Sequence, residues 1–179
     1  TVGYTSVFRQ IILPSGDTNA TQISADAYQV AILTSNGNVY TAGANTFGGT
    51  SAGGEAGCGT PVSGSSTCPL DSSAQITYNG TAVNLIKANL TPLGGAKVVS
   101  IYNTSLGNNG LYMNTFLIDN KGRVWGAGDN SVGQLGNGCN PASTGTNLCS
   151  AQKIVGTFTN MKVFDGTNVL ACSVQSGRG

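Results

Sequence analysis

The chain has 179 residues, of which 8% are charged and 39% are hydrophobic, and its net charge at pH 7 is +1. An average soluble domain carries roughly 25% charged residues, so most of the surface of this one must be neutral and polar. The Lys and Arg residues are scattered singly, which argues against nucleic-acid binding. No apolar run reaches the ~18 residues of a membrane-spanning helix, so we expect neither a membrane span nor a retained signal segment.

The chain opens with residues 1–22, which are predicted to be the tail of a preceding repeat. They hold an apolar run at residues 11–13 followed by a turn at Pro14. A first repeat is predicted over residues 23–96. It starts with a lead-in strand at residues 22–25, an apolar strand at 30–33, a turn ending at Gly37 and a second strand at 39–40. Glycine adopts a positive φ there without a steric penalty, so this order predicts a β-hairpin.

The first repeat continues through a loop rich in Ser, Thr and Gly to residues 75–78, which are predicted to form its fourth strand. Residues 79–96 are an insertion, predicted to contain one short helical turn around residues 84–88. Insertions in repeat proteins map to loops on one face. This one is either a binding surface or a solvated loop.

The second repeat is predicted over residues 97–160 and repeats the same order. It has a lead-in strand at 97–100, an apolar strand at 116–118, a turn ending at Gly122, a second strand at 124–125 and an outer strand at 152–155. Residues 103–112 are a second loop insertion, with the same two interpretations. A third copy begins within residues 161–179, with a lead-in strand at 161–164 and an apolar strand at 169–172.

The fullest copy of the motif spans residues 116–138, where Gly-Arg-Val-Trp at 122–125 is followed by Gly-Gln-Leu-Gly at 133–136. This motif resembles the RCC1-like repeat of seven-bladed β-propellers, and the copy at 31–49 departs from it only toward its end. The resemblance implies an all-β fold of antiparallel propeller-type blades. A ring of about seven blades needs more than twice this length, so we expect an incomplete ring whose open ends could support self-assembly.

Family members often carry a His before the first strand of the repeat. Here Gln29, Asn114 and Val169 hold those places, and the chain has no His at all. This departure argues against the nuclear exchange-factor role known in the family.

Four of the five cysteines fall at the same phase of the two repeats. Each pair follows a glycine and encloses nine residues, the pairs being Cys58 with Cys68 and Cys139 with Cys149. We interpret them as local disulfides that stabilise each loop by ~2–3 kcal/mol, in preference to a zinc site, whose thiolates usually lie closer in sequence. Disulfides predict an oxidising compartment, so the protein is expected to be secreted or on the cell surface. Cys172 is left unpaired by this pattern. We expect it to be a small buried hydrophobic residue, or to pair with a cysteine outside this sequence.

Asn-x-Ser/Thr sequons permit glycosylation at four sites, namely Asn19, Asn79, Asn89 and Asn103. The carboxylates show no arrangement typical of catalysis. Asp119 and Asp129 lie beside Gly and Asn in turns, where Asp usually accepts local backbone hydrogen bonds. No His is available as a general base, and no calcium or zinc ligand pattern occurs. We therefore expect no enzymatic activity, cofactor or metal.

Three functions fit these observations. The first is an extracellular interaction module that presents its loops to a protein or glycan partner. The second is a structural subunit of an extracellular fibre or adhesin, whose incomplete ends are covered by adjoining sequence or a neighbouring chain. The third is a secreted protein inhibitor of an enzyme, suggested by fold resemblance alone.

Overall fold

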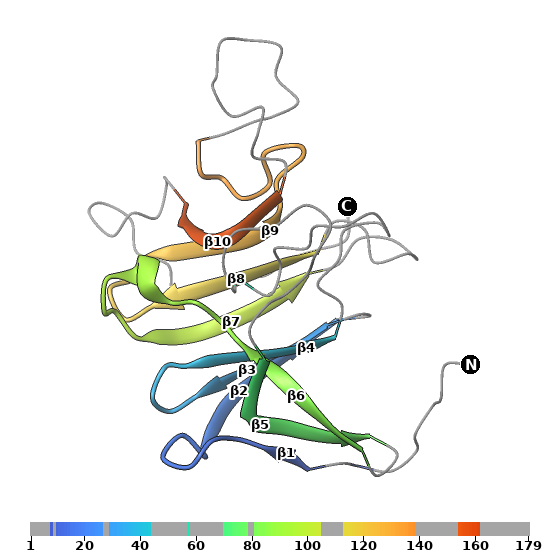
Figure 1. Ribbon diagram of the computed structural model, residues 1–179. Helices are drawn as coiled ribbons and strands as arrows, with labels where there is room; N and C mark the ends of the chain where they lie inside the picture. Colours follow the sequence, from blue (N-terminus) through green and yellow to red (C-terminus); the bar gives the residue numbers. More distant parts are fainter. Residues whose placement is uncertain are drawn as a thin grey trace.

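The computed structural model describes residues 8, 10–26, 29–43, 57, 70–78, 81–104, 113–138 and 154–161. These residues form two antiparallel β-sheets and one 3-10 turn, and contain no α-helix (Figure 1). The predicted all-β class is confirmed. In chain order the elements are β1 (Ile11–Ile12), β2 (Ala20–Ala25), β3 (Gln29–Thr34), β4 (Val39–Gly43), β5 (Leu70–Tyr78), β6 (Thr81–Lys87), η1 (Thr91–Leu93), β7 (Val98–Thr104), β8 (Asn114–Asp119), β9 (Val124–Asp129) and β10 (Ile154–Asn160).

The second sheet has the strand order β10-β9-β8-β7, in which every strand pairs with its neighbour in sequence. Such a four-stranded antiparallel meander is the form of a propeller blade. The predicted hairpin is confirmed, since β8 and β9 pair from Ile118 and Val124 at the turn to Asn114 and Gly128 at the far end. The outer strand predicted at residues 152–155 is observed as β10, which begins at Ile154.

The first sheet is larger, with the strand order β1-β5-β6-β4-β3-β2. Its hairpin β3–β4 matches the prediction and pairs Leu33 with Val39 beside the turn. The strand predicted at residues 75–78 is observed, but its place in the sheet differs from the prediction. Residues 75–78 lie in β5, whereas the strand that pairs with β4 is β6, in the predicted insertion.

The helical turn predicted around residues 84–88 is also wrong. Residues 81–87 form β6, which lies between β4 and β5 and so has strand neighbours on both edges. Two flanking strands satisfy a backbone more completely than one isolated helical turn, so pairing overrides the local preference. The short helical element occurs a few residues later, at η1, where Pro92 lies in the first turn.

The described part of residues 1–22 lies in the first sheet. Strand β1 pairs with β5, with Ile11 opposite Ile76 and Ile12 opposite Gln75. Strand β2 then starts at Ala20 and pairs with β3. In Figure 1 the first sheet curls, so that β5 and β1 lie below the hairpin β3–β4.

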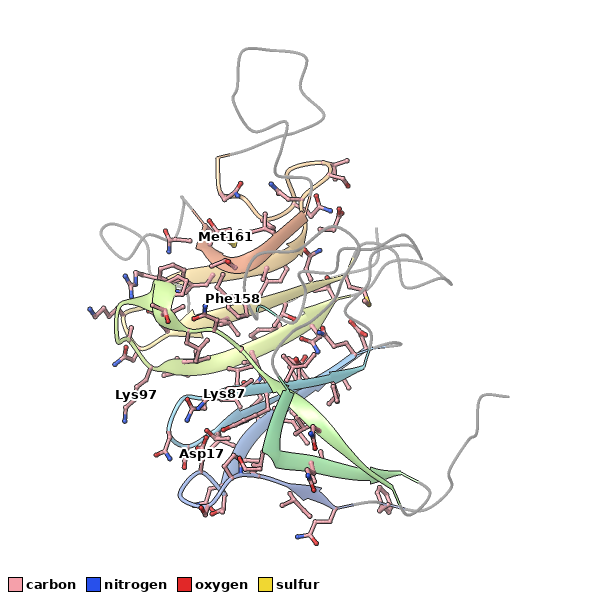
Figure 2. The ribbon with its side chains drawn as sticks, in the orientation of Figure 1. Asp17, Lys87, Lys97, Phe158 and Met161 are labelled. Carbon is pink, nitrogen blue, oxygen red and sulfur yellow. The ribbon has the colours of Figure 1, made fainter. Side chains whose placement is uncertain are left out.

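The two sheets pack on each other through one face of each. Residues alternate along a strand between its two faces. The shared core contains, from the first sheet and the segment after it, Ala31, Leu33, Val39, Ala88 and Leu93, and from the second sheet Val98, Ile101, Leu117, Trp125, Ala127 and Phe158. Figure 2 shows Phe158 on the second sheet. Leu117 and Ile101 are both fully buried there, so the two sheets share a hydrophobic core between them.

Polar side chains of β2 cover the free backbone edge of β7. Gln22 Nε2 donates to Ile101 O at 2.8 Å, and Ile101 N donates to Gln22 Oε1 at 2.9 Å. Two residues further on, Asn103 N donates to Ser24 Oγ at 2.8 Å. An unpaired strand edge is a liability in β proteins. Here the side chains of Gln22 and Ser24 make the hydrogen bonds to β7 that a neighbouring strand would otherwise make.

Candidate functional site

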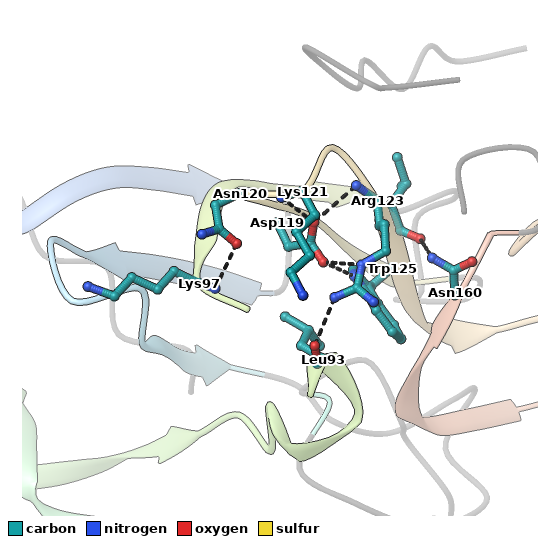
Figure 3. Close-up of polar contacts among 9 residues, drawn as sticks. Leu93, Lys97, Asp119, Asn120, Lys121, Arg123, Trp125 and Asn160 are labelled. Carbon is teal, nitrogen blue, oxygen red and sulfur yellow. Dashed lines mark hydrogen bonds and ion pairs between the residues drawn. The ribbon is translucent and has the colours of Figure 1, made fainter. Parts of the chain in front are cut away.

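The turn of the second hairpin is organised by Asp119, which is 1% exposed. Its Oδ1 accepts hydrogen bonds from the backbone N–H groups of Lys121 at 2.9 Å and Arg123 at 3.0 Å. Its Oδ2 accepts from Arg123 Nε at 2.7 Å and Trp125 Nε1 at 2.9 Å (Figure 3). The predicted turn role of Asp119 is confirmed.

These donors decide the charge state of Asp119. Burial alone raises the pKa of a carboxyl group, but the hydrogen bonds from Trp125, Arg123 and Lys121 outweigh it, and the pKa of Asp119 lies below its ordinary value. The carboxylate is therefore charged at neutral pH and bonded on both oxygens.

Arg123 connects this turn to the segment that precedes the second sheet. Its Nη2 donates to Leu93 O at 2.8 Å, and its guanidinium lies 4.8 Å from the centre of the Trp125 ring (Figure 3). Lys97 N donates to Asn120 Oδ1 at 3.2 Å on the other side of the turn. This end of the second sheet is thus fixed by polar contacts that join the hairpin turn to the segment before the sheet.

The loop after β9, residues 129–138, is the candidate functional site, and we call it the exit loop. Asp129 Oδ2 accepts hydrogen bonds from Ser131 Oγ at 3.0 Å and from Gln134 Nε2, and its Oδ1 accepts from Ser131 N at 3.2 Å. Asn130 Oδ1 accepts from Leu135 N at 3.1 Å. The turn role predicted for Asp129 is confirmed, and the loop is closed by its own side chains.

One end of the exit loop is buried and the other is exposed. Leu135 is fully buried and packs against Phe116, Ile118 and Val124. Val132 is 66% exposed, and its N–H donates to Gln134 Oε1 at 3.0 Å. The loop therefore holds an apolar side chain in water at a fixed position.

The pKa of Asp129 is shifted in the opposite direction to that of Asp119. It is 2% exposed, and burial raises its pKa more than the hydrogen bonds from Ser131 and Gln134 lower it. Desolvation favours the neutral form of a carboxyl group. The exit loop is accordingly built on a carboxyl group that binds its proton more readily than a free Asp does.

The four cysteines predicted to form disulfides lie outside the described part of the chain, namely Cys58, Cys68, Cys139 and Cys149. Cys172, which was predicted to be unpaired, and the sequon at Asn79 lie outside it as well. Gly57, next to the first of them, is described. Asn89 N donates to Gly57 O at 2.8 Å, and a Cβ on Gly57 would lie 2.1 Å from Phe158 Cε2. Gly57 therefore lies against the second sheet.

The remaining sequons differ in accessibility. Asn19 and Asn89 are exposed, and Asn89 Oδ1 accepts a hydrogen bond from Thr91 N at 3.1 Å. Asn103 is 9% exposed, and its Nδ2 donates to Ser24 O at 3.2 Å. A glycan attached at Nδ2 would have to displace that contact, so of these three sites only Asn19 and Asn89 suit modification of the folded chain.

The described residues show neither a metal-binding cluster nor a membrane-spanning helix. They contain no group of three or more His, Cys, Asp or Glu side chains close enough to hold a metal ion. No helix within them is long and apolar enough to cross a membrane. The exposure of Val132 and the contacts of Gln22 with β7 were not predicted from the sequence, although Gln22 was placed in the lead-in strand at residues 22–25.

No protein-family model and no curated protein sequence matches the chain. Similar solved structures include Prp20p from Saccharomyces cerevisiae, which is described with its binding to Gsp1p and histones. Its TM-score with this chain is 0.49 and its sequence identity is 16%, over 84% of this chain and 27% of Prp20p. Yeast RCC1 (Prp20) bound by Kap60 gives 0.47 and 14% over 84% and 26%. Human WBSCR16 gives 0.40 and 14% over 79% and 25%. The chain thus spans about a quarter of the length of these proteins.

Proposed function

We propose that this chain is a non-enzymatic, extracellular protein-interaction module that binds its partner through the exit loop. The observation that carries the proposal is the exposure of Val132 on a loop whose other end is anchored in the core by Leu135. An apolar side chain held in water gains free energy when a partner covers it.

The rigidity of the exit loop supports this function. Binding costs free energy when side chains and loops must be ordered at the interface. Here Asp129 and Asn130 already order the backbone by accepting hydrogen bonds from Ser131 and Leu135. A loop fixed before the encounter loses little further entropy, so a small apolar contact contributes more of its free energy to affinity.

The chemistry of Val132 favours a protein over a glycan as the partner. A glycan site needs several polar groups converging on one sugar, whereas the tip of the exit loop presents an aliphatic side chain. The proposed extracellular setting is supported by four cysteines at matching positions of the two repeats, because disulfides between them would persist in an oxidising compartment.

The test is capture of a partner on the immobilised chain from extracellular material of the source organism, followed by identification of the retained protein. We expect a protein that is retained by the native chain and lost with Val132→Asp. The matched control is Val99→Asp, because Val99 is 54% exposed on β7, away from the exit loop. Equal retention on all three chains would contradict the proposal, and release by free sugars would point to a glycan instead.

A further inference from the structure

The two blades show which faces of a repeat meet a neighbour. In the second blade, Leu117 and Trp125 face the first blade and belong to the shared core. By the repeat, Leu117 corresponds to Ile32 and Trp125 to Tyr40. Ile32 and Tyr40 therefore lie on the face with which the first blade would receive a preceding one. We call this face the receiving face.

The receiving face of the first blade is already filled. Ile32 and Tyr40 are each 1% exposed, and they pack with Ala74 of β5 and Leu85 of β6. The partly buried hydrophobic residues around them include Ile11, Leu13, Val30 and Ala42. The sheet curls at β6 and returns under the hairpin, so that β5 and β1 occupy the place where another blade would pack (Figure 1).

Hydrogen bonds centred on Asp17 tie the segment after β1 to the β3–β4 hairpin, and we call this group of contacts the latch. Asp17, which is 6% exposed, follows β1 and lies beside the first sheet (Figure 2). Its Oδ2 accepts hydrogen bonds from Asn38 Nδ2 at 2.8 Å and from Tyr40 Oη at 3.1 Å. Nearby, Asn36 Nδ2 donates to Gly16 O and Ser35 N donates to Asn19 O, each at 2.8 Å.

The latch takes the role that Asp119 has in the second blade. There the carboxylate accepts a hydrogen bond from the aromatic residue of its own hairpin, Trp125. In the first blade the corresponding residue is Thr34, and the carboxylate that bonds the aromatic residue comes from Asp17 instead. Burial raises the pKa of Asp17, but the polar side chains around it, including Asn38 and Tyr40, lower it by more, so the carboxylate is charged at neutral pH.

We propose that the first blade is a self-capped terminal blade, whose receiving face is sealed by β1, β5 and the Asp17 latch and takes no preceding blade. Repeat arrays need such caps because each repeat exposes an apolar face at the end of the stack. The array then extends only from the side of the second blade, and no ring closes through the first blade. This inference does not depend on the proposed function of the exit loop.

The first test uses hydrogen exchange and tyrosine nitration on the native full chain, read by mass spectrometry. We expect slow exchange in peptides that cover β1 and β5, together with a Tyr40 that nitrates at least about tenfold more slowly than in the unfolded chain. Fast exchange in β1 with Tyr40 still protected would mean that another blade or a second copy covers the face. Fast exchange with Tyr40 reactive would mean that the face is open. Either result overturns the proposal.

The second test compares two neighbours in β1 that point in opposite directions. Ile11 packs on the receiving face, whereas Ile12 is 48% exposed. Ile11→Asp should raise the nitration rate of Tyr40 at least about tenfold, since a buried charge opens the cover, while Ile12→Asp should leave it unchanged. The fluorescence of the single Trp, at position 125, reports whether the rest of the chain stays folded. The proposal would be refuted by equal nitration rates of Tyr40 in the two variants, whether both rates are fast or both are slow.

Discussion

Replacing Gln22 tests how the two blades are joined. The Gln22 amide makes two hydrogen bonds to the backbone of Ile101 and accepts a third from Ser100 Oγ at 3.1 Å. Ile101 is fully buried, so its N–H and C=O groups have little access to water once the amide is removed. A net intramolecular hydrogen bond contributes ~0.5–1.5 kcal/mol, so losing the two backbone bonds in Gln22→Ala should cost about 1–3 kcal/mol of unfolding free energy.

The assay is urea denaturation followed by fluorescence of Trp125, which lies in the core shared by the two sheets. The control is Ile23→Ala. Ile23 is the next residue on β2 and is 57% exposed, so truncating it should change stability by less than about 0.5 kcal/mol. A second variant, Gln22→Glu, keeps an acceptor for Ile101 N but places a carboxylate against Ile101 O.

We expect the stability order native, Ile23→Ala, then the two Gln22 variants, with unchanged slopes of free energy against urea. A cost for Gln22→Ala no larger than that for Ile23→Ala would refute the idea that Gln22 caps the edge of β7. A Gln22→Glu variant as stable as the native chain would refute the donor half of the interaction.

Three further predictions concern single side chains. Gly57→Ala should destabilise the chain by about 2 kcal/mol or more, because the new Cβ would lie 2.1 Å from the ring of Phe158. The control is Gly16→Ala, where φ is +87° and the space is open, so it should cost only the ~1–2 kcal/mol of a left-handed backbone. Equal costs for the two variants would contradict the predicted clash with Phe158. The pKa of Asp119 is lowered in the folded state, so its stabilisation is present above the unfolded pKa of ~3.9 and is lost as pH falls through the folded value. Asp119→Asn should therefore make the free energy of unfolding depend less on pH in acid. An unchanged dependence on pH would count against this role. The pH dependence from Asp129 has the opposite sign, because its raised pKa gives stability that is present below ~pH 3.9 and is lost as pH rises through the folded value. Asp129→Asn should remove this loss of stability in unfolding curves taken at successive pH values. A loss that persists in the variant would show that another group titrates.

The hairpins could be predicted because their signals are local. Alternating or continuous apolar residues bracket a turn that ends in Gly37 or Gly122, and both glycines have positive φ in the structure. The roles of Asp119 and Asp129 in their turns were predictable for the same reason. Each accepts its hydrogen bonds from residues two to six positions later in the chain.

The pairing of the outer strands was not predictable, since it joins segments far apart in sequence. Nothing local in residues 81–87 distinguishes a strand from a helical turn, and only the neighbours β4 and β5 decide it. Residues 11–12 pair with β5, more than sixty positions later. A short apolar run does not specify which edge it joins, so the cover of the receiving face emerges only in three dimensions.

The exit loop shows a different limit. Val132 and Leu135 are both aliphatic and lie three residues apart, yet one is 66% exposed and the other is fully buried. Composition does not separate them. The outcome depends on the hydrogen bonds of Asp129 and Asn130, which turn the backbone so that only Leu135 reaches the core. The disulfides and the extracellular setting remain predictions, and peptide mapping of the unreduced chain tests both pairs.

The most direct measurement of the central claim is site-specific photo-crosslinking at the exit loop. The photoreactive residue p-benzoylphenylalanine replaces Val132 in one chain and Val99 in another, and both are irradiated in extracellular material of the source organism. If the exit loop is the binding surface, the chain labelled at position 132 forms a covalent adduct with a defined protein, and the chain labelled at position 99 does not. Adducts of equal yield at both positions, or none at position 132, would contradict the account.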